Sequence, residues 1–233
     1  MSDSEILKEI EKSTAYRIEL QLYQFDLNFE MFERDYNDLK ESLNIINDPN
    51  NLVRLWGDLS KTDELDSLII DVTRKLINFL AFLKALVDCN RRVIKNEYKD
   101  TPFFGEYQKM VTATFDQSSL VQFLEGLRNF FMHYSLMLVR AHQSLSYDDS
   151  QGLLVIENRF LLRKDTLLQW GKWEKGEEYL KSLKDNVDIE EITEKYFSLA
   201  RQFHNWLISS LRTVHTEELE WLKQKRNELQ RKM

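Results

Sequence analysis

The sequence contains few of the residues that make tight turns. Its six glycines and two prolines form about 3% of 233 residues, against about 12% in an average protein. β-Sandwiches and β-barrels need many turns built from such residues, so an all-β fold is excluded. A doubly wound α/β fold is disfavoured as well, because no glycine-rich strand-to-helix turn occurs. The composition therefore predicts a mostly helical protein with long elements and few connections.

A second cysteine, long apolar runs and excess positive charge are also missing. The lone Cys89 allows neither an internal disulfide nor a multi-cysteine zinc site. There is no run of 18 apolar residues, and the chain starts with acidic residues where a signal peptide carries basic ones. We therefore expect a cytoplasmic protein with no membrane contact. A net charge of −7 makes the whole chain a poor collector of nucleic acid, which leaves only a local basic site.

Apolar residues recur every three or four positions through most of the chain, which predicts long amphipathic helices. The first is expected over 4–46 with a break near Ser13, and the second begins after a cap at Thr62 or Asp63. The last is expected from about Val187, with an interruption near Thr216.

Two further elements are expected in the middle of the chain. The spacing predicts a helix from Asp116 to about Gln143. A turn over 148–152 between β-like residues predicts a small β-hairpin near 144–162. No linker or repeat divides the sequence, so we expect a single domain over 1–233.

Common catalytic and ligand-binding motifs are absent. The sequence has no G-x-G-x-x-G, no H-E-x-x-H and no G-x-S-x-G, and none of its four histidines has a second histidine at helical ligand spacing. We therefore expect neither a cofactor nor a metal ion.

One passage, residues 125–134, contains a motif that carries chemistry. Arg128 and Asn129 are followed by His133, an R-N-x-x-x-H pattern that arises by chance in on the order of 1% of chains this long. On a helix Asn129 and His133 share a face, and Arg128 lies about 140° around from His133.

This motif resembles the signature of the HEPN superfamily of helical nucleotide-binding and ribonuclease domains. That signature is R-x(4–6)-H on a helix, often with a polar residue directly after the arginine. The wider run from Phe79 to Val139 is similar to uncharacterised bacterial HEPN-like proteins, in which a helix with a basic end precedes the motif helix. One position differs from the toxin-type members: they often carry a tyrosine two residues after the histidine, where this chain has Ser135.

The resemblance implies a HEPN-like bundle and a metal-independent endoribonuclease, in a bacterial defence or toxin-like setting with an antitoxin or other protein partner. It also implies a homodimer in which two motif helices form one composite site. The residues expected to be catalytic are Arg128, Asn129 and His133. The residues expected to bind RNA substrate are Arg91, Arg92, Lys95 and Tyr134.

The chemistry of these side chains agrees with that activity. A histidine can move a proton at neutral pH, an arginine can bind a phosphate, and an asparagine can orient either of them. A purely structural role is the alternative for each residue. In that alternative, Arg128 would pair with Glu125 or another acid, His133 would be a half-buried histidine beside Phe130 and Tyr134, and Asn129 would be a solvated helix residue. The alternative functions are a non-catalytic RNA- or nucleotide-binding module and a helical protein-interaction module.

Overall fold

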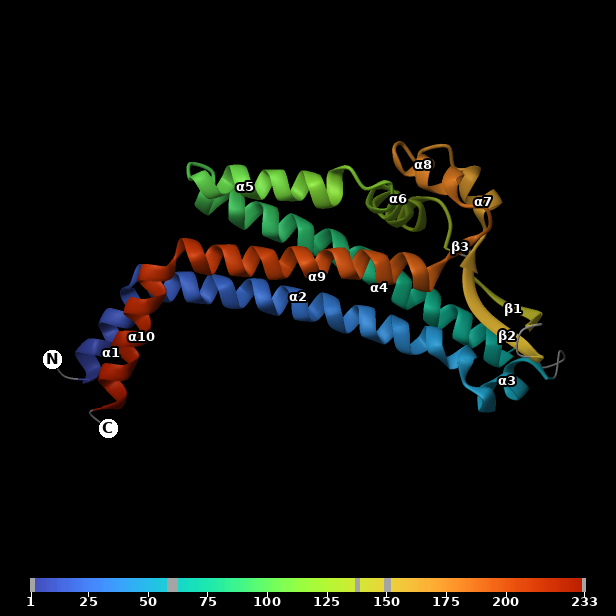
Figure 1. Ribbon diagram of the computed structural model, residues 1–233, viewed down its shortest axis with the longest axis horizontal. Helices are drawn as coiled ribbons and strands as arrows, with labels where there is room; N and C mark the ends of the chain where they lie inside the picture. Colours follow the sequence, from blue (N-terminus) through green and yellow to red (C-terminus); the bar gives the residue numbers. More distant parts are fainter. Residues whose placement is uncertain (1–2, 58–62, 137–138, 149–151, 232–233) are drawn as a thin grey trace.

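Three long helices lie side by side along the molecule in the computed structural model, which describes residues 3–57, 63–136, 139–148 and 152–231 (Figure 1). They are α2 (Thr14–Asn44), α4 (Asp63–Tyr98) and α9 (Ile189–Val214). The mostly helical class predicted from the composition is confirmed. Thr62, one of the two expected caps of α4, lies outside the described residues.

Aromatic side chains fill the space between these three helices. Phe32 of α2 stacks on Phe79 of α4 with ring centres 5.1 Å apart, and Tyr36 of α2 stacks on Phe197 of α9 at 3.9 Å. All four side chains are buried. Complete burial of a large apolar side chain contributes about 1.5–3 kcal/mol, so these four aromatic side chains stabilise the packing of the three helices.

The long first helix is interrupted where the sequence predicts a break. α1 (Asp3–Lys12) ends before Ser13, whose hydroxyl accepts a hydrogen bond from the Tyr16 amide at 3.1 Å and so caps α2. At the other end of the chain, α10 (Thr216–Gln230) follows α9 after His215 and packs against α1. Both termini therefore lie at the same end of the molecule (Figure 1).

The segments between the long helices carry the motif. η1 (Ile45–Asn47) and α3 (Pro49–Trp56) connect α2 to α4, and α5 (Pro102–Val111) and the π-helical turn η2 (Thr112–Asp116) lead to α6 (Ser119–His133). The prediction that this helix reaches Gln143 is wrong, because it ends ten residues earlier. Ala141 fits both the helical spacing and the alternation of a strand. In the structure it belongs to a strand that begins at Val139, where it pairs with Phe160.

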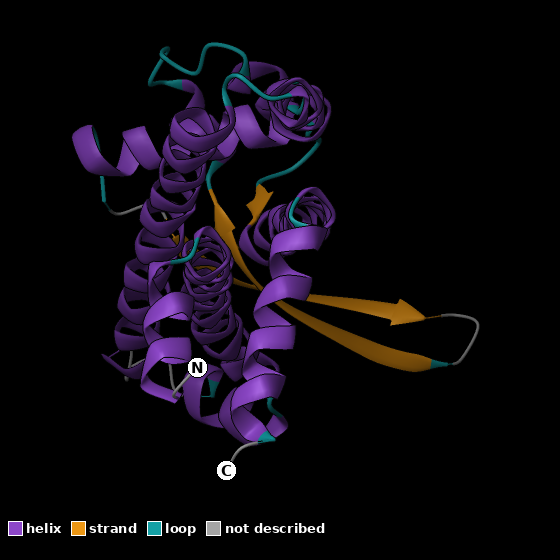
Figure 2. Cartoon of the chain, turned by 90° about the vertical axis from the view of Figure 1, so that its left-hand side faces the viewer, coloured by secondary structure: helices purple, strands orange, loops and turns teal. Residues whose placement is uncertain are grey.

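The second half contains a long β-hairpin that projects from the helices (Figure 2). β1 (Val139–Asp148) pairs antiparallel with β2 (Leu153–Leu162), and β2 pairs with the short β3 (Val187–Asp188). The predicted hairpin is confirmed, although its first strand starts five residues before the predicted position. Residues 149–151 of the predicted turn lie outside the described residues. Gly152 has a φ of 65°, a left-handed conformation that glycine adopts without strain.

The short helix α8 (Gly176–Ser182) covers α6, and α7 (Lys164–Leu168) packs against α8. Gly126 of α6 leaves room for the Trp173 ring, which a Cβ at this position would meet at 2.9 Å. The Trp173 Nε1–H donates a hydrogen bond to the Leu167 carbonyl at 2.6 Å, which fixes the ring. Gly176 in turn lies against the Phe123 backbone, so two glycines set how closely this cover approaches α6.

Candidate functional site

Arg128 occupies an unusual position on α6. It is half-buried, and its Nε lies enclosed without a hydrogen-bond partner. Its Nη1–H donates to the Asn129 Oδ1 at 3.2 Å. No ion pair joins it to any described carboxylate, and each of the other described arginines either pairs with a carboxylate or is exposed. The expected alternative partner, Glu125, therefore does not neutralise this guanidinium.

His133 and Tyr134 form the exposed end of α6. His133 is the last helical residue, and the amides of Tyr134 and Ser135 both donate to the Phe130 carbonyl, at 2.8 and 3.2 Å. The Tyr134 ring lies 5.0 Å from the Phe130 ring and is 56% exposed. His133 is exposed to solvent rather than half-buried beside Phe130. A substrate can thus reach the imidazole.

The basic end of α4 lies elsewhere. Arg91 faces Asp116 at 3.7 Å, in the turn that precedes α6. His133 is at the opposite end of α6, about 20 Å further along a helix of this length. The Arg92 guanidinium lies 3.9 Å from the Cys89 sulfur, and Lys95 is exposed. The fold therefore brings Arg128 and Asn129 together at one end of α6 and leaves the three basic residues of α4 toward the other.

Two tryptophans and one arginine lie near α6. Trp170 packs edge-on against Phe130 and Trp173, and Trp173 stacks on Phe130, so both tryptophans anchor the cover over α6. Arg140 is exposed at the start of β1 and lines an open groove with Leu136. The sequence did not predict that Arg140 lines this groove, because the residue was assigned to a continuing helix.

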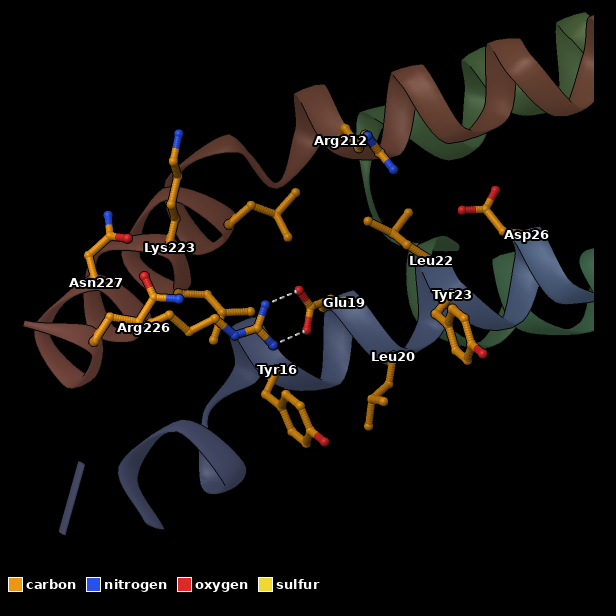
Figure 3. Close-up of a pocket in the computed structure, with 13 residues that line it drawn as sticks. Tyr16, Glu19, Leu20, Leu22, Tyr23, Asp26, Arg212, Lys223, Arg226 and Asn227 are labelled. Atoms are coloured by element: carbon orange, nitrogen blue, oxygen red, sulfur yellow. Dashed lines mark hydrogen bonds and ion pairs between the residues drawn. The ribbon is translucent and has the colours of Figure 1, made fainter. Parts of the chain in front are cut away.

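An open groove lies far from the motif, between the first turns of α2 and the α9–α10 segment (Figure 3). Its volume is about 780 Å³. Arg226 makes a two-point ion pair with Glu19 across it, with N–O distances of 2.5 and 2.6 Å. Lys225 likewise pairs with Glu9 at 3.0 Å. These basic side chains of α10 thus attach it to α1 and α2.

A small cavity of about 30 Å³ lies inside the helices, beside His204 of α9. The His204 Nε2 lies 3.1 Å from the Asp26 Oδ1, and its ring stacks on Phe29 at 4.3 Å. Its Nδ1 and the Asn90 Oδ1 are both enclosed without partners. Burial lowers the pKa of His204, while the carboxylates of Asp26 and Glu33 oppose that shift.

The described part of the chain contains no group of three or more His, Cys, Asp or Glu side chains placed to hold a metal ion. Within the same ranges, no helix combines the length and the apolar character needed to cross a bilayer. No protein-family model, curated protein or solved structure matches this chain.

Proposed function

We propose that this chain is a metal-independent endoribonuclease of the HEPN type, with Arg128, Asn129 and His133 as its catalytic residues. The observation that carries the proposal is the half-buried Arg128, which has no described carboxylate partner. A partly desolvated cation without a counter-ion is a favourable site for an anion, and a phosphodiester is the anion that arginine binds best in two-point geometry.

The reaction needs few groups. The 2′-hydroxyl of the substrate attacks the neighbouring phosphorus, the bond to the 5′-oxygen breaks, and a 2′,3′-cyclic phosphate remains. His133 moves the proton of the attacking or the leaving oxygen, since imidazole exchanges protons near neutral pH. Arg128 stabilises the charge that develops on the phosphate oxygens. Asn129 holds the guanidinium through its Oδ1.

One Arg128 and one His133 make a sparse site in a single chain. A two-fold dimer doubles both residues and lets the arginine of one copy act with the histidine of the other. The exposed Met132, Tyr134 and Leu136 around His133 support such an arrangement, because they offer apolar surface beside the motif.

The test is cleavage of mixed RNA with and without EDTA. We expect cleavage to survive the chelator and to leave 2′,3′-cyclic phosphate ends. His133→Ala should abolish cleavage with an unchanged Tm, because the side chain is exposed. His142→Ala is the matched control, since His142 is also exposed but lies on β1 outside the motif. Full activity in His133→Ala would contradict the proposal.

The same arginine also supports a second function, a non-catalytic RNA- or nucleotide-binding module. In that case the wild-type chain binds RNA or nucleotide without cutting it. Arg128→Ala then weakens binding, whereas His133→Ala leaves binding unchanged.

A further inference from the structure

The β-hairpin has one apolar face that runs its whole length. Residues directly opposite each other in an antiparallel pair share a face, so the register divides the hairpin into two faces of ten residues. Eight of the ten on one face are apolar: Val139, Ala141, Leu145, Tyr147, Leu154, Ile156, Phe160 and Leu162, with Gln143 and Asn158 as the other two. The opposite face has only Leu153, Val155 and Leu161 as apolar members.

The helices cover only the inner half of this apolar face. Val139, Phe160 and Leu162 are at most 7% exposed. The Gln143 Nε2–H donates a hydrogen bond to the Asn158 Oδ1 at 3.0 Å midway along the hairpin. Between this bond and the tip, the same face is exposed to solvent.

The outer half, which we call the arm tip, consists of Leu145, Tyr147, Leu154 and Ile156. These side chains are 63, 63, 62 and 45% exposed, and none is charged. An isolated two-stranded hairpin is marginally stable in water, and a period-2 apolar face is typical of a strand that is covered on one side. The arm tip therefore has the surface of a half-buried sheet without its cover.

An apolar groove lies at the base of the same hairpin. It has a volume of about 740 Å³ and is lined by Ile69, Ile70 and Ile77 of α4 together with Leu136 and Val139. Ile70 is 64% exposed and Leu136 is 58% exposed. Asp66, Arg74 and Arg140 add polar groups to its lining, the mixture of apolar and polar surface that protein interfaces have.

We propose that two copies of this chain exchange arms, each arm tip filling the groove at the base of the other hairpin. Two hairpins that lie antiparallel place each tip beside the base of its partner, and one two-fold axis makes both contacts identical. Strands of ten residues are about 30 Å long, which separates tip from base by enough for two independent contacts.

The area of contact fits a second copy. Large side chains present about 150–250 Å² when fully exposed, so the four of the arm tip offer on the order of 400 Å² at their exposed fractions. Two tips and two grooves then bury about 1,600 Å², the size of a standard stable interface. The arm tip has no charged side chain, so it carries none of the charge pattern with which a different partner is selected.

This inference goes beyond the ribonuclease proposal and does not depend on it. It names a surface for self-association that lies outside the motif. The two are connected in space, because Leu136 of the groove comes three residues after His133. Each arm tip therefore lies beside the end of α6 in the other copy, while the two α6 ends lie about one arm length apart. This dimer is thus a different pairing from one in which two α6 helices share a site.

Oligomeric state tests the inference, measured by light scattering and sedimentation at micromolar concentration. The wild-type chain should be a dimer, and Leu154→Arg and Ile70→Arg should each give monomers with an unchanged Tm. Ser146→Arg is the matched control, because it adds the same charge to the same hairpin on its opposite face and should remain dimeric. Mixing the Leu154→Arg and Ile70→Arg chains should restore dimers partly, since one intact tip and one intact groove remain.

A monomeric wild-type chain would overturn the inference and assign the arm tip to another protein. Dimers of Leu154→Arg, or monomers of Ser146→Arg, would also overturn it. If Leu154→Arg is monomeric while Ile70→Arg is dimeric, the arm-to-groove arrangement is wrong. RNA cleavage by monomeric Leu154→Arg would refute the composite site alone, because the dimer inference rests on mass and not on activity.

Discussion

Replacing Arg128 by methionine should raise the stability of the protein while it removes RNA cleavage. Methionine keeps the apolar stem of arginine and loses the guanidinium. The enclosed Nε of Arg128 has no partner, and its contact to Asn129 is exposed. Arg128→Met therefore deletes an unsatisfied group without leaving a described carboxylate unpaired.

The magnitude follows from that enclosed donor. A buried donor without a hydrogen bond costs about 1–3 kcal/mol, and a net hydrogen bond contributes about 1 kcal/mol. Since Arg128 is only half-buried, we expect the free energy of unfolding to increase by up to about 1 kcal/mol, a Tm rise of about 2–4 °C for a chain of this size. Arg128→Lys should keep the Tm and lose most of the cleavage, because an ammonium lacks the planar fork.

Thermal unfolding and RNA cleavage should be measured on Arg128→Met, Arg128→Lys and Asn129→Ala together. Asn129 carries no charge, so its loss should cost less cleavage than either change at Arg128. A fall of Tm in Arg128→Met, with cleavage lost only in proportion to the unfolded fraction, would refute the reasoning. The arginine would then be a structural residue of α6.

Two further predictions concern stability. Gly126→Ala should lower the free energy of unfolding by about 1 kcal/mol in denaturant titration, because the clash with Trp173 exceeds the gain in helix propensity. Gly105→Ala, whose Cβ meets no described atom within 4 Å, should instead stabilise α5 by up to about 1 kcal/mol. Equal effects of the two substitutions would contradict the packing argument. The buried His204 has a lowered pKa in the folded chain, so the unfolded chain takes up a proton first as pH falls below about 6.5. The free energy of unfolding should decrease from pH 7.5 to 5.5 in wild type and in His142→Gln, and should decrease less in His204→Gln. If its pH dependence is the same in all three chains, His204 is not the group responsible.

Sequence patterns predicted the long helices well because their apolar stripes are continuous. The stripe from Ile18 to Leu43 is buried in α2, and the Ser13 break is visible in the same spacing. The end of α6 was harder to predict. Its spacing continues to Ala141, and only the pairing of Ala141 with Phe160, nineteen positions later, makes this residue part of a strand. Long-range pairing of this kind is not contained in a local window.

Only the local part of the candidate site was predictable from the sequence. Arg128 and Asn129 are adjacent in the sequence, so their contact needs only a helix. The basic residues of α4 were grouped with them from the resemblance, yet Arg91 faces Asp116, in the turn before α6, and not the His133 end of that helix. The exposed arm tip depends on where the helical cover ends, which requires the tertiary structure.

The number of cations that contact RNA can be counted from the salt dependence of binding. For single strands, the logarithm of the affinity falls with the logarithm of salt concentration with a slope of about −0.7 per phosphate contact. One Arg128 in each chain of a dimer predicts a slope of about −1.4. If Arg91, Arg92 and Lys95 also contact the strand, the slope steepens to between about −5 and −6.

We expect the shallow slope, because Arg91 is engaged by Asp116 and the basic end of α4 lies far along α6 from His133. The measurement uses His133→Ala, so that RNA stays intact, with fluorescent RNA titrated at several salt concentrations. Arg91→Ala in that background should leave the slope unchanged, whereas Arg128→Ala should abolish most of it. A steep slope that Arg91→Ala reduces would place the RNA along α4 and make Arg128 a minor contact.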